Sequence, residues 1–252
     1  MNHITDQFYG VTKGKEKTFV NGFHQIFNSI NDTKKGIYCS DNLLTWGRNL
    51  SFMKNERLMK IFNKHSKGQY PLHGILWRTA TIVWAAEIGL KLEGDFVECG
   101  CYKGTTAKVV HEYLEFSKIK DKRYFLYDLF EHDESFSHHA MPEHSKTLCD
   151  EVKDLFKSEK NVVITKGKLP ETLSINCPEK ISFMHLDLNN VDAEIGTLEI
   201  LFEKMVPGSI IVLDDFGWMY YENQNIYELD WFNKKGYSVL EIPTGQGILI
   251  KR

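Results

Sequence analysis

The chain has 252 residues, 42% of them hydrophobic, so it can bury a full core as one α/β domain with extensions. Its 31 basic and 34 acidic residues give a net charge of −3 with no basic run, which argues against a nucleic-acid partner. No apolar run approaches the roughly 20 residues that span a bilayer, and the N-terminus lacks signal-peptide features. With five cysteines and no CxxC pair, we expect a cytoplasmic protein with no membrane partner.

Residues 1–74 are predicted to form a helical N-terminal extension. Phenylalanines recur at a four-residue interval within 15–30, and apolar residues share one helical face within 49–65. Segment 75–92 predicts a stronger helix that is apolar on most faces and buried against the following domain. The aromatic-rich extension could cap a site or pair with another subunit, so a homo-oligomer stays open.

From Gly94 onward, short apolar strands alternate with amphipathic helices. Helices between strands imply a parallel sheet with right-handed crossovers and helices on both faces. The clearest of these helices is predicted over 192–205, closed by "PGS". The candidate strands lie at 95–99, 123–128, 161–165, 181–187 and 209–214.

Two further strands, 237–242 and 247–252, end the chain and are joined only by "PTGQ". This connection is too short for a parallel crossover, so the pair must be antiparallel. The sequence therefore predicts a doubly wound α/β domain over residues 75–252.

The loop after the first predicted strand carries a pair of glycines. Glu98 ends the strand, Gly100 and Gly104 follow, and a helix begins near Thr105. In open α/β sheets, ligands bind beyond the carboxyl ends of the strands. The dinucleotide pattern G-x-G-x-x-G does not fit, because Tyr102 stands where its middle glycine would be, which disfavours a dehydrogenase. A tight turn explains the glycines equally well.

Acidic residues end three other predicted strands. Asp128 ends the second strand, where nucleotide-binding α/β folds place the acid that binds a ribose. Asp187 ends the fourth strand, and Asp214 and Asp215 end the fifth. Unpaired carboxylates on one rim would repel each other, whereas Mg²⁺ prefers oxygen ligands and leaves positions open for a substrate. In the alternative interpretation, Asp215 caps the next helix and Asp187 binds loop amides.

Two sequence blocks resemble known methyltransferases. "FVECGCYKGTTA" with "YDLFE" resembles motifs I and II of class I S-adenosylmethionine-dependent methyltransferases. "GDFVECGCYKG", "KGKLPETL" and the spacing to "LDDFGW" are similar to the macrocin and mycinamicin sugar O-methyltransferases, and the first block also resembles catechol O-methyltransferase. The resemblance covers roughly residues 75–252 and implies a Rossmann-like, seven-stranded sheet with a reversed last strand.

The resemblance also implies site residues. Asp187, Asp214 and Asp215 would bind Mg²⁺, which chelates a substrate hydroxyl. The catechol family has a lysine where this chain has Asn190, and the D-x-D of sugar methyltransferases becomes Asp187-Leu188-Asn189, which leaves open whether Asn189 is a ligand. S-adenosylmethionine would be held by Glu98, Gly100, Tyr102, Gly104, Thr105, Asp128, Gly167, Lys168 and Asp187.

A general base is expected in the long loop after the second strand, which holds four histidines. We favour His138 or His139, since neutral histidine accepts a hydroxyl proton near pH 7; a solvated loop explains each of them as well. Downstream, Trp218, Tyr220 and Tyr221 offer flat surfaces for an acceptor, or pack as core.

The predicted function is a Mg²⁺-dependent S-adenosylmethionine O-methyltransferase that modifies a hydroxyl of a sugar or of a sugar-containing small molecule. The alternatives are a catechol- or phenol-type small-molecule O-methyltransferase and a non-catalytic S-adenosylmethionine-binding protein.

Overall fold

The computed structural model describes residues 2–30, 36–69, 72–132 and 141–252. The chain forms two compact units, residues 1–80 and 81–252. Among the described residues, no helix has both the length and the apolar character needed to cross a membrane.

The first unit contains a small sheet as well as helices. Helix α1 (Glu16–Ser29) follows its prediction. Strand β1 (His3–Ile4) pairs in parallel with β2 (Tyr38–Ser40), which pairs antiparallel with β3 (Leu43–Thr45). The sequence analysis expected only helices and turns here, because strands of two or three residues are too short to show a period of two.

The helix predicted over 49–65 is interrupted. A 3₁₀ turn spans Ser51–Lys54, and α2 begins afterwards and runs over Glu56–Ser66. Asn55 separates them as the N-cap, because its side chain accepts a hydrogen bond of 3.0 Å from the amide of Leu58. Asn55 therefore sets where α2 starts, and the spacing of apolar residues alone does not reveal this.

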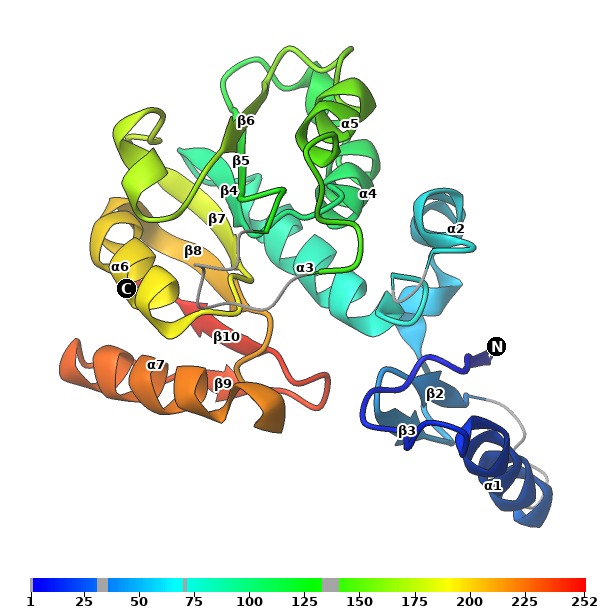
Figure 1. Cartoon of the computed structure of the whole chain (residues 1–252). Helices are drawn as coiled ribbons and strands as arrows, with labels where there is room; N and C mark the ends of the chain where they lie inside the picture. Colours follow the sequence, from blue (N-terminus) through cyan, green and yellow to red (C-terminus); the bar gives the residue numbers. More distant parts are fainter. Residues whose placement is uncertain (1, 31–35, 70–71, 133–140) are drawn as a thin grey trace. The chain divides into compact units, whose positions relative to one another are not determined.

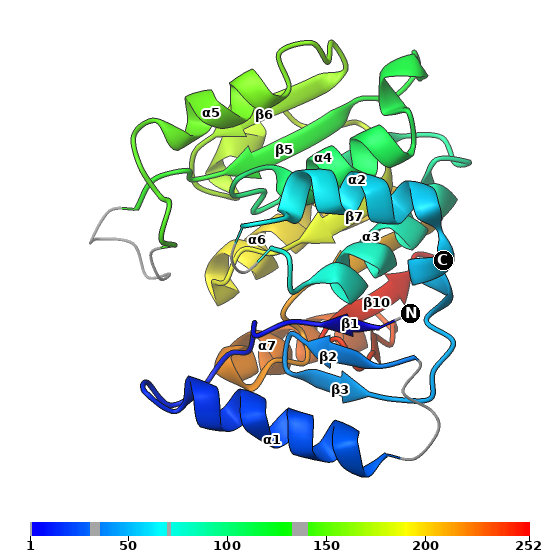
Figure 2. The same ribbon diagram turned by 90° about the vertical axis from the view of Figure 1, so that its right-hand side faces the viewer.

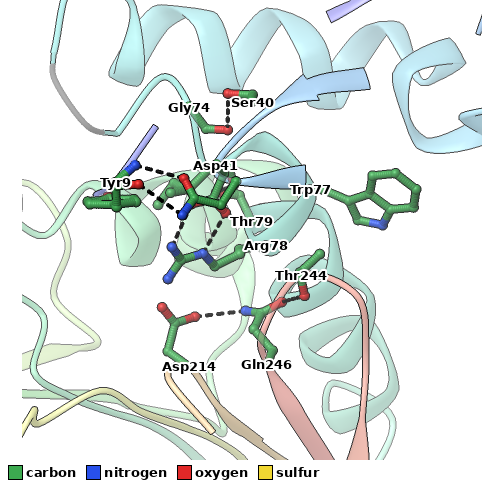
Figure 3. A network of polar contacts seen from close by, with 12 residues as sticks. Tyr9, Ser40, Asp41, Gly74, Trp77, Arg78, Thr79, Asp214, Thr244 and Gln246 are labelled. Atoms are coloured by element: carbon green, nitrogen blue, oxygen red, sulfur yellow. Dashed lines mark hydrogen bonds and ion pairs between the residues drawn. The ribbon is translucent and has the colours of Figure 1, made fainter. Parts of the chain in front are cut away.

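A buried ion pair joins the β2–β3 turn to the start of helix α3 (Leu76–Gly89) within this unit. Asp41 accepts hydrogen bonds of 2.7 Å from Nε and 2.6 Å from Nη2 of Arg78 (Figure 3). This bidentate contact fixes the relative orientation of the two side chains as well as the distance between them. Since both side chains are buried, removal of either one would leave an uncompensated charge.

The second unit is built on one mixed sheet. Within the described residues its strand order is β6-β5-β4-β7-β8-β10-β9 (Figure 1). The first five strands in that order are parallel, and β10 is antiparallel to both of its neighbours. The predicted doubly wound, Rossmann-like sheet with a reversed last strand is confirmed. The bounds are β4 Asp95–Cys99, β5 Tyr124–Asp128, β6 Val162–Lys166, β7 Ile181–Leu186, β8 Met205–Leu213, β9 Leu240–Glu241 and β10 Gly247–Ile250.

Helices cover both faces of this sheet. Figures 1 and 2 show α4 and α5 on one face and α6 and α7 on the other. Their apolar sides enclose strand residues such as Val97, Met184 and Ile211, which have no exposed surface. The helix bounds are α4 Thr105–Tyr113, α5 Leu148–Leu155, α6 Val191–Leu201 and α7 Glu222–Lys234, and single 3₁₀ turns lie at Phe116–Lys118, Glu171–Ser174, Phe202–Lys204 and Met219–Tyr221.

One predicted boundary is wrong. The helix expected over 192–205 ends at Leu201, and "PGS" lies inside β8 rather than closing the helix. The pairing of β7 with β8 shifts register between Ile181 and Phe183. An irregularity of this kind admits a proline and a glycine into a strand.

The topology brings four strand ends to one rim. The chain leaves β4 for β5 on one side, whereas β7 adds on the other side of β4, so the strand order reverses there. In open α/β sheets this reversal marks the ligand-binding crevice. The carboxyl ends of β4, β5, β7 and β8 are therefore where a site is expected.

Candidate active site

The loop after β4 is shaped by residues with positive φ. Gly100, Tyr102 and Gly104 have φ of 88°, 47° and 69°. A Cβ on Gly100 would lie 1.7 Å from the carbonyl oxygen of Asp187, so only glycine fits beside β7. Gly104 is the N-cap of α4, and the loop thus brings the positive end of that helix to the rim.

Asp128, the acid expected to bind a ribose, holds this loop. Its Oδ2 accepts a hydrogen bond of 2.7 Å from the Tyr102 amide, and its Oδ1 accepts one of 2.5 Å from the Phe130 amide. Burial raises the pKa of Asp128 to about 7, against the opposing effect of the Phe130 amide. Each carboxylate oxygen has a second lone pair, so the contacts leave capacity for a ribose hydroxyl.

Asp128→Asn is expected to weaken both the loop and ligand binding. One acceptor oxygen becomes an NH₂ group that faces a backbone amide, which costs about 1–3 kcal/mol of stability. We expect S-adenosylhomocysteine affinity to fall about tenfold, measured by calorimetry alongside urea unfolding. Asp150→Asn, at an exposed position of α5, is the control. Unchanged affinity in Asp128→Asn would show that Asp128 has no part in binding.

A buried histidine links the ends of three strands. His185 on β7 places Nε2 3.3 Å from Asp214 Oδ1 and Nδ1 3.8 Å from Glu98 Oε1. Burial alone would lower the pKa of His185, but the hydrogen bond with Asp214 and the negative charges of Glu98 and Asp214 raise it well above its ordinary value. A protonated His185 would therefore balance the charges of Glu98 and Asp214 when no cation is bound, whereas only the neutral imidazole can serve as a metal ligand. Glu98 also accepts a hydrogen bond of 2.7 Å from the Tyr124 hydroxyl.

Sequence reasoning missed His185 while singling out Asp187 two positions later. A signal was present, because a strand alternates its faces and a histidine two residues before a terminal acid shares that acid's side of the sheet.

Asp214 is held from the last hairpin as well. Gln246 has no exposed surface, and its Nε2 donates a hydrogen bond of 2.8 Å to Asp214 Oδ1. Thr244 donates a hydrogen bond of 2.9 Å to Gln246 Oε1 and so fixes the orientation of the amide (Figure 3). The reversed strand thus helps to orient an acid at the end of β8.

Three side chains form a candidate cation site. His185, Asp187 and Asp214 each offer a ligand atom, and these atoms lie within 4.8 Å of one another. Asn189 Nδ2 donates a hydrogen bond of 3.3 Å to Asp187 Oδ1. Asn189 Oδ1 is buried and accepts no hydrogen bond from the described residues. An unpartnered amide oxygen on a side chain that contacts Asp187 fits a cation that prefers oxygen ligands.

Asp215, the third predicted metal ligand, lies outside this cluster at the next position of the chain. The alternative that it caps the following helix does not hold, because α7 begins at Glu222 with Tyr221 as its N-cap. The Asp215 carbonyl instead accepts the Trp218 amide in a turn. Asp215 as a metal ligand stays a prediction.

A pocket of about 560 Å³ is lined in part by Asn189, which is hydrogen-bonded to Asp187. It lies between the β7–α6 loop and the segment that leads into α7. We call it the rim pocket, and its described lining residues are Asn189, Asn190, Val191, Asp192, Met219, Tyr220, Tyr221, Glu222, Asn223 and Gln224. Two of the three predicted acceptor-binding aromatics, Tyr220 and Tyr221, are in this lining.

The other predicted cofactor residues lie at or near the same rim. Thr105 is the buried first residue of α4. Gly167 donates its amide to the Asp128 carbonyl at 2.9 Å, whereas Lys168 points its ammonium toward Glu171 at 3.8 Å. His138 and His139 lie outside the described residues.

Comparisons with solved structures show the same fold. The O-methyltransferase NovP is 17% identical with a TM-score of 0.62, and the match covers 76% of this chain and 87% of NovP. Calicheamicin methyltransferase CalS11 is 14% identical with a TM-score of 0.56, covering 79% and 92%. The S-adenosylhomocysteine-bound methyltransferase PaMTH1 of Podospora anserina is 14% identical with a TM-score of 0.56, covering 80% and 92%. A search of curated proteins found no match.

The sheet order and the rim are those of the class I S-adenosylmethionine-dependent methyltransferase fold. The family model for macrocin O-methyltransferases (TylF) matches residues 83–228, more than half of the chain. The chain belongs to this family and is an S-adenosylmethionine-dependent O-methyltransferase.

Proposed function

We propose that this enzyme methylates a hydroxyl of a sugar or of a sugar-containing small molecule and depends on Mg²⁺. The observation that carries the proposal is the closeness of Asp187 and Asp214, together with Asn189, which contacts Asp187 and lines the rim pocket with an unpartnered Oδ1. Oxygen donors next to a pocket suit an acceptor hydroxyl that is chelated before it reacts.

Two separate groups of residues would hold the cation and S-adenosylmethionine. Asp187 and Asp214, with Asp215 as the third predicted ligand, would hold the cation, which when bound lowers the pKa of the acceptor hydroxyl. The loop from Gly100 to Gly104, with Asp128 and Gly167, would hold S-adenosylmethionine. Together they would bring the hydroxyl and the sulfonium methyl into line.

The lining of the rim pocket favours a sugar acceptor. Amide side chains hydrogen-bond ring hydroxyls, and the exposed ring of Tyr220 offers a face on which a sugar can pack. A solved neighbour of this fold, CalS11, is a TDP-rhamnose 3′-O-methyltransferase.

A phenolic acceptor is less favoured by the structure. Asn190, which stands where catechol O-methyltransferases have their lysine, accepts the Ala193 amide at 2.9 Å as the N-cap of α6. An amide side chain is not basic, and this one already caps a helix, so Asn190 does not take the place of that lysine as a base.

The remaining predictions complete the proposal. Residues 75–252 would form the S-adenosylmethionine-binding domain, and residues 1–74 would form a cap or a subunit contact. His138 or His139 would act as the base. The reducing cytoplasm is the proposed compartment, in keeping with five cysteines that are all free in the structure.

Calorimetry and turnover test these roles separately. S-adenosylhomocysteine should bind with or without Mg²⁺, and release of this product should require Mg²⁺ together with a glycoside from a panel of sugars and catechols. Failure to bind the nucleoside would contradict the cofactor assignment. Equal turnover after chelation of divalent ions would contradict only the metal assignment, and exclusive turnover of catechols would contradict the sugar assignment.

A further inference from the structure

Two glutamates that the proposed chemistry does not use are buried between α6 and α7. Glu194 on α6 is 3% exposed, and Glu228 on α7 is 2% exposed. The two helices pack against each other beside the rim pocket. A buried acid requires partners that make up for its lost hydration, so the contacts of this pair are informative.

The contacts of Glu194 lead to the candidate cation site. Its Oε1 accepts a hydrogen bond of 3.1 Å from the Leu188 amide, and Leu188 directly follows Asp187. Its carboxyl group is also hydrogen-bonded to the side chains of Gln224 and Glu228. Gln224 is itself part of the rim-pocket lining.

Two carboxyl groups in hydrogen-bond contact must hold a proton between them, because two carboxylates have no hydrogen to share. Burial raises the pKa of both Glu194 and Glu228, although the hydrogen bonds that Glu194 makes with Gln224, Leu188 and Glu228 oppose its rise. The charge of Asp214 adds to the rise for Glu194, and those of Glu194 and Asp215 add to it for Glu228. Asp214 and Asp215, which follow β8, carry negative charge, and this charge favours the protonated form of the pair.

The loop from Asp187 to Asn190 is fixed at three points, and Glu194 supplies one of them. The Asp187 amide donates to the Cys99 carbonyl at 2.8 Å, and Asn190 caps α6. Between these two anchors, Asn189 has φ of 54°, in the left-handed region. A residue other than glycine keeps this conformation only where its surroundings hold it.

We propose that Glu194 and Glu228 share one proton and act together as positioning residues, which hold the Leu188 amide so that Asp187 and Asn189 face the cation. This inference rests on the proposed function, since the cation belongs to it. The pair does not touch the reacting atoms; it acts through the loop and through Gln224.

The shared proton is tested by the pH dependence of unfolding. Below the pKa of an unfolded glutamate the pair contributes its full stability, and this contribution is lost as the pH rises through the raised folded value. As the pH rises from about 4.3, the pKa of an unfolded glutamate, toward the raised folded value, the urea midpoint of the wild type should therefore fall.

The variants Glu228→Gln and Glu222→Gln complete this experiment. In Glu228→Gln, the side-chain amide donates to Glu194 and carries no titrating proton. The urea midpoint of this variant should therefore fall at most about half as much as that of the wild type over the same pH range. Glu222→Gln, at an exposed position of α7, should show the same fall in urea midpoint as the wild type. Parallel curves for the wild type and Glu228→Gln would overturn the shared proton.

The positioning role is tested with Mn²⁺ as the probe, followed by electron paramagnetic resonance. Glu194→Ala leaves the Leu188 amide without its acceptor and should weaken Mn²⁺ binding about tenfold. Glu194→Gln keeps an acceptor oxygen and should restore the affinity to within about threefold. S-adenosylhomocysteine affinity should be the same in both variants, which separates a local effect from a general loss of structure.

Equal Mn²⁺ affinity in Glu194→Ala and the wild type would overturn the positioning role, and so would a Glu194→Gln variant as weak as Glu194→Ala. If Glu194→Ala does not fold, the comparison of Glu194→Gln with the wild type and the pH experiment on Glu228→Gln decide the matter. A wild type that binds S-adenosylhomocysteine but no Mn²⁺ contradicts the proposed metal dependence and, with it, the positioning of a cation; the pH curves then still decide the shared proton.

Discussion

Replacing Gly100 by alanine is expected to abolish S-adenosylhomocysteine binding and to destabilise the second unit by about 3 kcal/mol or more. The added Cβ would lie 1.7 Å from the Asp187 carbonyl oxygen and 2.6 Å from its carbon, and both belong to backbone. The φ of 88° is also one that alanine rarely adopts. The ends of β4 and β7 would have to separate, and the loop from Gly100 to Gly104 would move together with Asp187.

Gly208→Ala separates the two causes of this effect. Gly208 has a similar φ of 86°, but a Cβ there would meet only the Leu92 side chain at 3.7 Å, which is an ordinary contact. It therefore carries the backbone strain without the collision, and we expect a loss of about 1–2 kcal/mol with ligand binding retained. Urea unfolding and calorimetry on both variants check this. Wild-type ligand affinity in Gly100→Ala would contradict the tight approach of the two strand ends.

Replacing Asp214 by alanine is expected to remove metal-dependent turnover and also to cost about 3–5 kcal/mol of stability. From the sequence alone, Asp214 is predicted only to bind a metal ion, so its loss would be expected to spare cofactor binding. In the structure it is 6% exposed and accepts hydrogen bonds from His185 and Gln246. Its removal would leave an imidazolium beside Glu98 with one counter-charge fewer, and an amide without its acceptor.

Asp215→Asn is the matched comparison for Asp214, because the two acids are adjacent and Asp215 is only partly buried. Both Asp214→Ala and Asp215→Asn should lose Mg²⁺-dependent turnover, but only Asp214→Ala should unfold at markedly lower urea concentration. S-adenosylhomocysteine binding at low temperature shows whether each variant is folded. If Asp214→Ala were as stable as the wild type, the buried network around His185 would contribute little.

The sequence predicts the rim well, because the features that define it are local. Gly100 and Gly104 follow an apolar strand, Asp128 ends the next one, and the lengths of the connections require parallel strands. Strand ends of a parallel sheet meet at one edge, so Asp187 and Asp214 come together without knowledge of any tertiary contact.

The missed features depend on contacts between residues far apart in the chain. His185 and Glu194 look like isolated polar residues in apolar segments, and only the packing of α6 and α7 brings Glu228 to Glu194. The small sheet of the first unit pairs His3 with Tyr38, a partnership that no periodicity can reveal. Polar groups inside the core are thus found only once their partners are known.

The imidazolium of His185 has a consequence for the order in which this enzyme is assembled. Many metal sites cannot form before their ion arrives, because the empty ligands repel each other and the chain stays unfolded. Here a side chain of the protein already balances Glu98 and Asp214. We therefore expect the chain to reach its native state without a bound cation, so that folding would not wait for a metal ion.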